Sequence, residues 1–395
     1  MPKKVLFISN GHGEDVNGSM VAQALHLQDP TVQLGAMPIV GAGNAYRKLN
    51  IPIIGPTKSE MPSGGFAYMD KRLLAADVFD GLIGRLWQQI MAVRQYCQDA
   101  DLIFVTGDQV VLGIAALTKC PYLALLSSCS AHYEGRLRIA PIKDSLIGAD
   151  RCKQIFTRDL FTTEVFRKRG FNRSNFWGNP FMDALIPSGR NLHLDSQSPM
   201  VAMLPGSRLP EAANNLVILL RLAIELSRLR MQPQMWLALT PNFELGDPHP
   251  LQAVAKAEGW DCHENQLYYP PLKLKVGFAT DAFADILEKC NLVCGMAGTA
   301  IEQAVGLGKP IVQLPGEGPQ FTYSFAEAQM RLLGDSIETI GTKPANTESI
   351  QAAAEVIDRT LSDPVRLRYC SLHGQERVGG KGAAAKMAQE ILRWI

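Results

Sequence analysis

Short apolar runs alternate with longer stretches of helical periodicity along most of this sequence. The clearest runs lie at 5–9, 102–106, 122–127, 200–204 and 311–314. Strands that are apolar throughout are typical of parallel sheets covered on both faces, and repeated strand-then-helix units favour an α/β fold. We therefore expect doubly wound sheets whose ligands bind beyond the carboxyl ends of the strands.

The pattern stops at a polar, turn-rich segment, 187–199, and then restarts. A chain of 395 residues exceeds what one hydrophobic core usually serves. We expect two domains, 1–190 and 191–375, that face a central cleft, a common location for small-molecule sites. Residues 376–395 are expected to form a final helix without an obvious partner strand.

Local signals predict further details near the N-terminus. Residues 32–40 and 51–54 fit a second and a third strand. Residues 10–19 fit a glycine-rich turn, with Asp15 as the cap of the following helix. The glycines of this turn do not have the dinucleotide-binding spacing, so no NAD site is predicted.

Composition narrows the classes of function. The 39 Lys and Arg residues balance 38 Asp and Glu residues, so no net field attracts nucleic acid. The N-terminus runs straight into a strand and not into a secretory signal, and no apolar run is long enough to span a bilayer. The eight scattered Cys residues fit the core of a cytoplasmic protein. Cys290 and Cys294 have no His pair at zinc spacing beside them, so no metal is expected.

The stretch 61–97 combines apolar and aromatic residues at helical spacing with the basic residues Lys71, Arg72, Arg85 and Arg94. A segment of this kind can rest on an anionic membrane surface. The same stripe also fits the core face of a long helix. The sequence leaves both interpretations open.

The stretch 290–316 predicts a complete strand–helix–strand unit. Gly298 lies in a small-residue turn after the strand 291–294, and Thr299 with Glu302 has the pattern of a capping box that starts the helix. Free N–H groups and the positive end of a helix dipole suit a diphosphate. Alternatively, Thr299 and Glu302 do no more than cap the helix.

A second turn of this kind, Gly206-Ser207-Arg208, follows the strand 200–204. The guanidinium could pair with a diphosphate through two hydrogen bonds while the N–H groups of Gly206 and Ser207 close around it. Otherwise Arg208 is an ordinary surface residue. Two such turns in one domain match one ligand with two phosphates. Gln320, after a later strand, could hydrogen-bond a sugar.

Asp108 and His12 are the candidate proton acceptors of the first half. Asp108 follows the strand 102–106, where a carboxylate could take a proton from an attacking hydroxyl, but it could equally be a helix N-cap. His12 could act as a base, stabilise charge, or be an ordinary turn residue. Glu14 fits a loop-shaping role and Asn179 a turn.

The order of these motifs resembles that of lipid-A-disaccharide synthase, a glycosyltransferase family with two Rossmann-like domains, the GT-B fold. Leu204–Arg208 with Glu211 matches the family's L-P-G-S-R-x-x-E, and Ala297–Glu302 matches its S-G-T-A-T-L-E. Further motifs are echoed by GHGEDVNG, FVTGD, FWGNPFMD and RVGGKGAAAKMA. The resemblance spans nearly the whole chain.

The resemblance implies a UDP-sugar as donor substrate, of the UDP-N-acetylglucosamine or acylated UDP-glucosamine type, and no cofactor. It implies an inverting, metal-independent transfer to a lipid acceptor at the membrane surface, and a last helix that crosses back to the N-terminal domain. Glu302 would hold the ribose hydroxyls. The other donor-side residues would be Gly206, Ser207, Arg208, Gly298, Thr299 and Gln320.

On the acceptor side, Asp108 would be the base, with His12 in reserve. The remaining acceptor-side residues would be Gly11, Gly13, Glu14 and Asn179. The first loop departs from the family pattern, and GEGPQ at 316–320 is more similar to the donor loop of the peptidoglycan N-acetylglucosaminyltransferase MurG. We therefore expect a relative of the synthase and not the synthase itself.

Two other functions fit the same sequence. A UDP-N-acetylglucosamine 2-epimerase-like enzyme shares the architecture and needs no acceptor. A non-catalytic sugar-nucleotide-binding protein would explain the altered first loop. The expected location is cytoplasmic or peripheral on the inner face of the plasma membrane, and a homodimer is left open.

Overall fold

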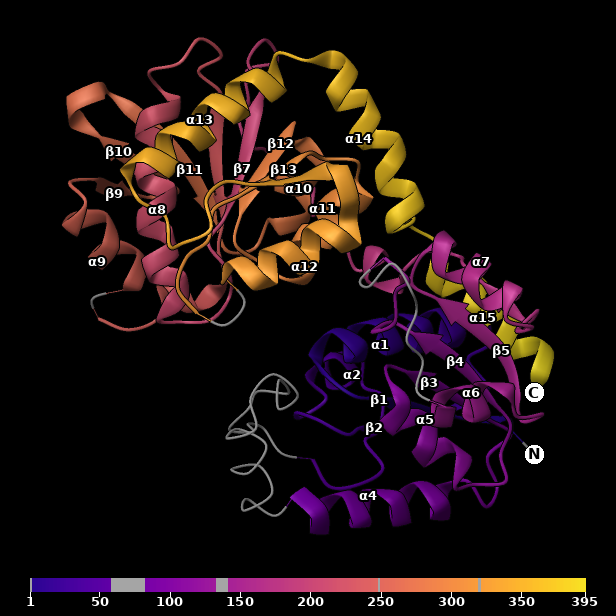
Figure 1. Cartoon of the computed structure of the whole chain (residues 1–395). Helices are drawn as coiled ribbons and strands as arrows, with labels where there is room; N and C mark the ends of the chain where they lie inside the picture. Colours follow the sequence, from indigo (N-terminus) through magenta and orange to yellow (C-terminus); the bar gives the residue numbers. More distant parts are fainter. Residues whose placement is uncertain (1, 58–81, 133–140, 248, 319–320) are drawn as a thin grey trace. The chain divides into compact units, whose positions relative to one another are not determined.

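The computed structural model describes residues 2–57, 82–132, 141–247, 249–318 and 321–395. The chain forms two compact units, Met1–Ala184 with Gly379–Ile395 and Leu185–Val378. Each unit has its own sheet with helices on both faces (Figure 1). Both units are Rossmann-like, which confirms the predicted α/β fold class.

In the described residues, the sheet of the first unit has six strands in the order β2-β1-β3-β4-β5-β6, and its strand pairs are parallel. The strands are β1 Lys4–Ser9, β2 Gln33–Pro38, β3 Leu102–Thr106, β4 Tyr122–Leu126, β5 Cys152–Thr157 and β6 Ser174–Asn175. The helices are α1 His12–Gln28, α2 Asn44–Lys48, α4 Leu82–Tyr96, α5 Gln109–Ala116, α6 Pro141–Gly148, α7 Leu160–Lys168, the 3-10 turn η2 Pro180–Met182 and α15 Ala383–Trp394.

Strand β1 shows why these runs are apolar throughout. Val5 and Phe7 pack into a core shared with α1 and α15, whereas Leu6 and Ile8 pack into a core shared with α4 and α5. Because successive side chains of a strand point to opposite faces, a doubly covered strand must be apolar at every position.

The described part of the second unit has an eight-stranded sheet in the order β14-β13-β12-β7-β8-β11-β10-β9. The strands are β7 Met200–Leu204, β8 Gln234–Ala238, β9 Asp261–His263, β10 Gln266–Tyr269, β11 Leu274–Ala279, β12 Leu292–Gly295, β13 Ile311–Gln313 and β14 Ile337–Thr339. The helices are α8 Glu211–Leu226, α9 Pro250–Ala257, α10 Phe283–Lys289, α11 Thr299–Gly306, α12 Tyr323–Leu333, α13 Thr347–Leu361 and α14 Pro364–Arg377, and the 3-10 turns are η3 Pro241–Glu244, η4 Pro270–Leu272 and η5 Gly334–Ser336.

This second sheet is mixed, because β10 runs antiparallel to both β11 and β9. The parallel, doubly wound part of this sheet, from β11 to β14, is the part that the sequence pattern predicted. The edge strand β9 is largely exposed and carries polar residues, so its hydrophobic pattern is too weak to predict a strand.

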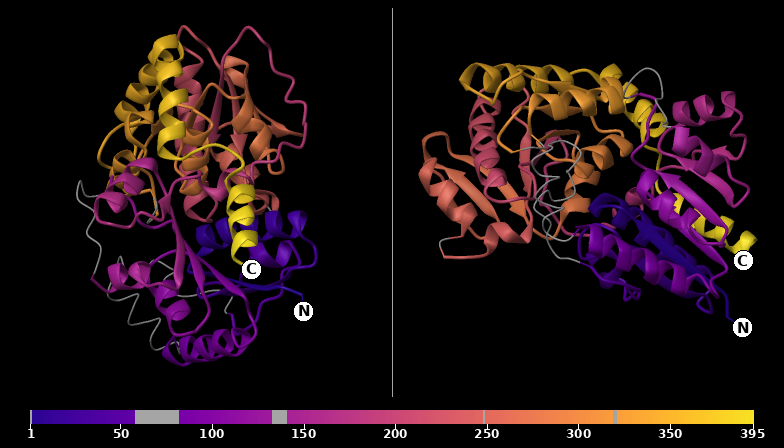
Figure 2. Two further views of the ribbon diagram at one scale, coloured as in Figure 1. Left: turned by 90° about the vertical axis from the view of Figure 1, so that its right-hand side faces the viewer. Right: turned by 60° about the horizontal axis from the view of Figure 1, so that its bottom comes forward.

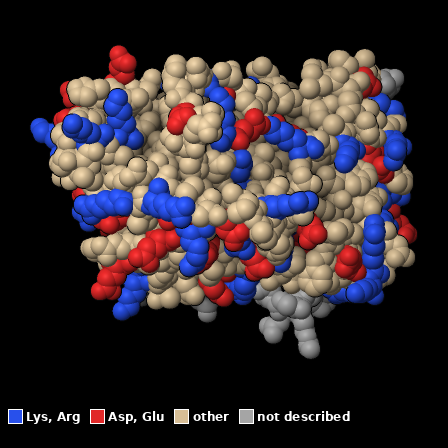
Figure 3. Space-filling view, turned by 90° about the horizontal axis from the view of Figure 1, so that it is seen from above, with Lys and Arg blue, Asp and Glu red and all other residues tan. Residues whose placement is uncertain are grey.

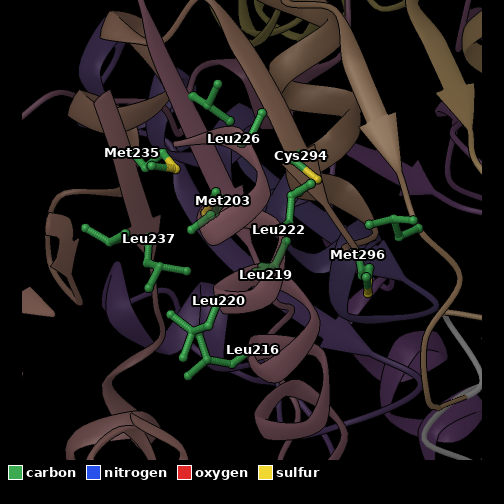
Figure 4. Close-up of a cluster of buried hydrophobic side chains, with 14 of the residues drawn as sticks. Met203, Leu216, Leu219, Leu220, Leu222, Leu226, Met235, Leu237, Cys294 and Met296 are labelled. Atoms are coloured by element: carbon green, nitrogen blue, oxygen red, sulfur yellow. The ribbon is translucent and has the colours of Figure 1, made fainter. Parts of the chain in front are cut away.

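Helix α8 forms the centre of the core on one face of this sheet (Figure 4). Leu216, Leu219, Leu220, Leu222 and Leu226 are buried there against strand residues such as Met203 and Leu237. Their spacing of three and four residues puts them on one side of the helix. Full burial of each leucine contributes about 2 kcal/mol to the stability of the folded unit. Helix α8 is therefore held firmly against the sheet, and so is the start of the helix, where the preceding loop ends.

The final helix that the sequence predicted over 376–395 is present as α15, but it starts later. Helix α14 ends at Arg377 and α15 begins at Ala383, and Gly379 and Gly382 between them have positive φ angles. Helix α15 lies along α1 in the first unit (Figure 2), where Met387 and Ile391 join the core. The Asp183 carboxylate accepts hydrogen bonds from the N–H groups of Gly382 and Ala384 and so caps α15.

Two local predictions, a strand at 51–54 and a cap at Asp15, were wrong. Residues 51–54 form no strand but a single bridge from Ile53 to Ala36. Helix α1 begins at His12, so Asp15 lies within its first turns and is not its cap. Residues 187–190 belong to the second unit, because the Asp285 carboxylate accepts hydrogen bonds from the N–H groups of Ser188, Gly189 and Arg190.

Part of the stretch 61–97 lies outside the described residues, which begin again with α4. Leu86 and Ile90 pack against the core, whereas the side chains of Trp87 and Met91 are exposed. The helices that the structure describes include none of the length and apolarity needed to cross a membrane. On the face drawn in Figure 3, basic and acidic side chains are interspersed.

Candidate functional site

The strand order of the second unit defines where a ligand fits. From β11 to β14 through β8, β7, β12 and β13, the order is that of a Rossmann domain. The chain goes from β7 to β8 on one side and later returns to β12 on the other, so the topological switch point lies between β7 and β12. Ligands of such sheets bind beyond the carboxyl ends of the strands at this point.

The two turns that the sequence singled out lie at this switch point. The turn after β7 contains Gly206, Ser207 and Arg208 and leads into α8. The turn after β12 contains Gly298 and leads into α11. Ser207, Arg208 and Thr299 are exposed, so both turns lie at the surface of the second unit.

Gly206 is required by the geometry of its turn. Its φ angle is +102°, a region that side chains disfavour. A methyl group there would lie 2.6 Å from Phe321 Cζ and 3.0 Å from the Met296 carbonyl oxygen. Gly206 thus lies close to Met296, whose N–H donates a 2.8 Å hydrogen bond to the Leu204 carbonyl. The two turns therefore lie side by side.

The predicted capping box at Thr299 and Glu302 is not formed. Gly298 occupies the N-cap position of α11, and Thr299 is the first helical residue. Glu302 therefore lies in the first turn of the helix and is half-buried. Because Gly298 has no side chain, the first N–H groups of α11 are left without a side-chain cap and can bind an anion.

Asn215, which the sequence analysis missed, fastens a third loop to the site. Its buried amide donates to the Pro205 carbonyl at 3.2 Å, and its oxygen accepts from Glu317 N–H at 3.2 Å. The loop after β13 is thereby joined to the turn after β7. Gln320, the predicted sugar contact, lies outside the described residues.

The first unit has its own switch point, between β1 and β3. Asp108 follows β3 and is the N-cap of α5, where its Oδ1 accepts a 2.8 Å hydrogen bond from Val110 N–H. The capping interpretation of Asp108 is thus correct. The side chain is half-buried at the carboxyl edge of the sheet, and capping does not prevent its outer oxygen from accepting a proton.

The first loop packs against the loops of both neighbouring strands. Gly11 is the N-cap of α1, Gly13 lies in the first turn, and His12 is exposed. A methyl group at Gly41, after β2, would lie 2.8 Å from His12 Cε1, and one at Gly107, after β3, would lie 3.5 Å from Glu14 Cγ. His12, Glu14 and Asp108 therefore share one edge of the first sheet.

Beneath this loop lies a buried polar cluster, Ser9, Asp15, Tyr46 and Thr106. Ser9 Oγ donates to Asp15 Oδ1 at 2.6 Å, and the Tyr46 hydroxyl donates to Ser9 Oγ at 3.1 Å. Burial raises the pKa of Asp15 to about 7, against the effect of the Ser9 hydrogen bond. Burial likewise raises the pKa of Tyr46. The polar Ser9 at the end of an apolar strand was the sequence signal for this cluster.

Asn179 holds a loop of the first unit in place. It is buried, and its amide donates to the Arg158 carbonyl at 2.9 Å. The turn that it starts is tied to α1, because Asn17 Oδ1 accepts a 2.8 Å hydrogen bond from Phe181 N–H. Asn179 thus shapes a loop next to the predicted acceptor side.

A further cluster follows β4 and β5 and was not predicted. The fully buried Asp159 carboxylate accepts hydrogen bonds from Ser130 Oγ at 2.7 Å and Thr162 N–H at 2.6 Å. His132 Nε2 lies 3.7 Å from the same carboxylate. Asp159 caps α7, so the cluster primarily anchors the loop after β4.

No family model matches the chain, and no curated protein matches it in sequence. Solved structures match it over its whole length. A UDP-N-acetylglucosamine 2-epimerase from Listeria monocytogenes is 16% identical with a TM-score of 0.58, covering 100% of this chain and 96% of that one. The calicheamicin glycosyltransferase CalG4 is 14% identical with a TM-score of 0.62, covering 100% and 98%.

MurG from Acinetobacter baumannii is 13% identical with a TM-score of 0.57, covering 99% of this chain and 100% of that one. At these identities the likeness establishes the GT-B fold, with one Rossmann-like domain in each half of the chain. It does not extend to the residues of a particular family.

Proposed function

We propose that this protein is a GT-B glycosyltransferase that binds a UDP-sugar in its second unit and transfers the sugar, with inversion and without a metal, to a lipid-linked acceptor. The observation that carries the proposal is the adjacency of the turns at Gly206 and Gly298, at the switch point between β7 and β12. The names of the similar structures, glycosyltransferases among them, support the same class.

In this proposal the diphosphate lies against the N–H groups of the two turns, and Arg208 pairs with it through two hydrogen bonds. Preorganised donors stabilise the charge that develops on the departing diphosphate without further reorganisation. Glu302, in the first turn of α11, holds the ribose hydroxyls. Gln320 is proposed as a sugar contact.

Asp108 is the proposed base that takes the proton of the acceptor hydroxyl, with His12 as the reserve candidate. Attack opposite the leaving UDP inverts the anomeric carbon, and positioning the acceptor provides much of the rate. Gly11, Gly13, Glu14 and Asn179 shape the loop on which the acceptor would rest. The lipid nature of the acceptor comes from the sequence resemblance.

Calorimetric titration with UDP tests the donor site. Arg208→Gln should weaken UDP binding at least tenfold, whereas Arg228→Gln, at the far end of α8 and paired with Glu225, should leave it unchanged. Turnover is then tested with a panel of UDP-sugars and a lipid extract, with UDP release as the readout. Wild-type protein that binds no UDP would refute the proposal.

A UDP-N-acetylglucosamine 2-epimerase is the second candidate, because an enzyme of that name matches the whole chain about as well as the transferases do. Formation of an epimerised sugar and free UDP without any lipid would favour it. UDP binding without turnover under either condition would favour a non-catalytic sugar-nucleotide-binding protein.

A further inference from the structure

A chain of hydrogen bonds runs through the second unit beneath the Gly298 turn. Thr339 Oγ1 donates to Gln313 Oε1 at 3.2 Å, and Gln313 Nε2 donates to Gln329 Oε1 at 2.6 Å. Gln329 Nε2 then donates to the carbonyl oxygens of Ala297, at 3.2 Å, and Gly298, at 3.4 Å. The chain joins β14, β13 and α12 to the turn before α11.

The two backbone carbonyls at the end of this hydrogen-bond chain fix which groups in it donate and which accept. Backbone carbonyl oxygens only accept hydrogen bonds, so Gln329 must present its NH₂ group to the turn and its oxygen to Gln313. Gln313 and Gln329 are 4% and 5% exposed. Buried amides are costly unless they are hydrogen-bonded, and a fully satisfied buried network is rigid.

Holding the two carbonyls also orients two N–H groups. In a planar trans peptide the C=O of one residue and the N–H of the next point in opposite directions. The Ala297 carbonyl shares its peptide plane with Gly298 N–H, and the Gly298 carbonyl shares its plane with Thr299 N–H. Ile301 N–H also donates to the Gly298 carbonyl, at 3.0 Å, so Gln329 shares the positioning of that peptide and alone among these side chains holds the Ala297 carbonyl that directs Gly298 N–H.

We propose that Gln329 is a positioning residue for the diphosphate of the nucleotide, supported from behind by Gln313 and Thr339. This inference rests on the proposed function, which assigns those two N–H groups to a diphosphate. Gln329 itself does not touch the ligand. Its removal should weaken recognition of the phosphates and leave recognition of the nucleoside intact.

The test is calorimetric titration of Gln329→Met with UDP and, separately, with uridine. Methionine keeps the length of the side chain but donates no hydrogen bond. We expect the affinity for UDP to fall about tenfold, which corresponds to about 1.4 kcal/mol, while the affinity for uridine is unchanged. The matched control is Gln351→Met, at an exposed position of α13, which should alter neither.

Unchanged UDP binding by Gln329→Met, or an equal loss for UDP and uridine, would overturn the inference. If Gln329→Met does not fold, Thr339→Val removes the far end of the chain, and the same selective but smaller loss is expected; its absence would also overturn the inference. Failure of the wild-type protein to bind UDP would instead refute the proposed function on which the inference rests.

Discussion

Ser9 and Asp15 share a buried 2.6 Å hydrogen bond at the carboxyl end of β1. The other carboxyl oxygen of Asp15 has no partner among the residues that the structure describes. A carboxylate in such a place loses its hydration without full compensation, which is why the pKa of Asp15 rises to about 7. The first loop therefore lies on a carboxylic acid that keeps its proton at pH values well above the usual pKa of aspartate.

This raised pKa predicts an unusual dependence of stability on pH. Between about pH 4 and pH 7 the native state holds a proton on Asp15 that the unfolded chain releases, so the free energy of unfolding falls as the pH rises through this window. Asp15→Asn should remove that loss and be more stable than the wild type at pH 8, by on the order of a few kcal/mol.

Urea unfolding of both proteins at pH 5 and pH 8 measures the effect. Asp150→Asn, an exposed substitution in the same unit, is the control and should follow the wild type at both pH values. A wild-type advantage over Asp15→Asn that grows with pH would contradict the raised pKa.

Substitution of Asp108 separates its capping role from its proposed catalytic role. Asparagine is as good an N-cap as aspartate, so Asp108→Asn should keep α5 and the folded stability while it removes the base. Turnover should fall by about 10²–10⁴-fold with nearly unchanged UDP affinity. Surviving turnover in steady-state assays would exclude Asp108 as the base.

The two turn glycines should respond differently to alanine. At Gly206 a methyl group meets Phe321 and the Met296 carbonyl, and φ is positive, so we expect a loss of more than about 1 kcal/mol of stability. At Gly298 a methyl group meets nothing within 4 Å. Gly298→Ala should therefore fold but weaken UDP binding, because the methyl group occupies the surface of the turn.

Thermal unfolding and UDP titration of both variants check this contrast. Equal destabilisation of Gly206→Ala and Gly298→Ala would mean that the second turn is also constrained by packing. Full UDP affinity in Gly298→Ala would show that the diphosphate does not approach this turn.

The sequence predicted the elements whose pattern reflects burial. The strands 102–106 and 200–204 were predicted with the bounds that the structure has, because almost every position in them is apolar and buried. The strands β9 and β10 were missed, since the side chains of an edge strand are partly exposed. The start of the last helix was predicted too early, at 376, because the clear helical pattern from Ala383 onward was extended back across Gly379, Gly380 and Gly382, residues that disfavour a helix.

Of the candidate site, the sequence identified the two turns and their place after buried strands, and their role in binding stays a prediction. The turns at Gly206 and Gly298 could be identified because glycines follow buried strands. The supporting residues could not, since Gln329 reaches the Gly298 turn from a helix some 30 residues later and Asn215 joins the turn after β7 to a loop about 100 residues later. Gln313 is a polar residue inside an apolar strand, and this is the one local sign in the sequence of the buried network that it forms with Gln329.

The carboxylate of Asp183 contributes to holding the last helix, α15, in place. Its carboxylate accepts hydrogen bonds from two N–H groups in the first turn of α15 and also complements the helix dipole. Asp183→Ala should destabilise the first unit by about 1–2 kcal/mol and increase hydrogen exchange in α15. Exchange in α8, in the other unit, should not change. Wild-type exchange rates in α15 would mean that Met387 and Ile391 hold the helix alone.

The exposed side of α4 allows a test of membrane contact that spares the core. Trp87 and Met91 are 63% and 46% exposed, one turn apart. Leu86 packs inward, so a charge at Leu86 would damage the fold and confuse the result.

If α4 rests on an anionic membrane, burial of the two exposed side chains contributes to binding together with the nearby Arg94. Trp87→Glu with Met91→Glu should then reduce flotation with anionic vesicles at least tenfold, while Leu27→Glu, an exposed leucine on α1, leaves it unchanged. Equal flotation of the double variant and the wild type would assign α4 to the solvent-facing surface, and the lipid acceptor would have to be reached by another part of the chain.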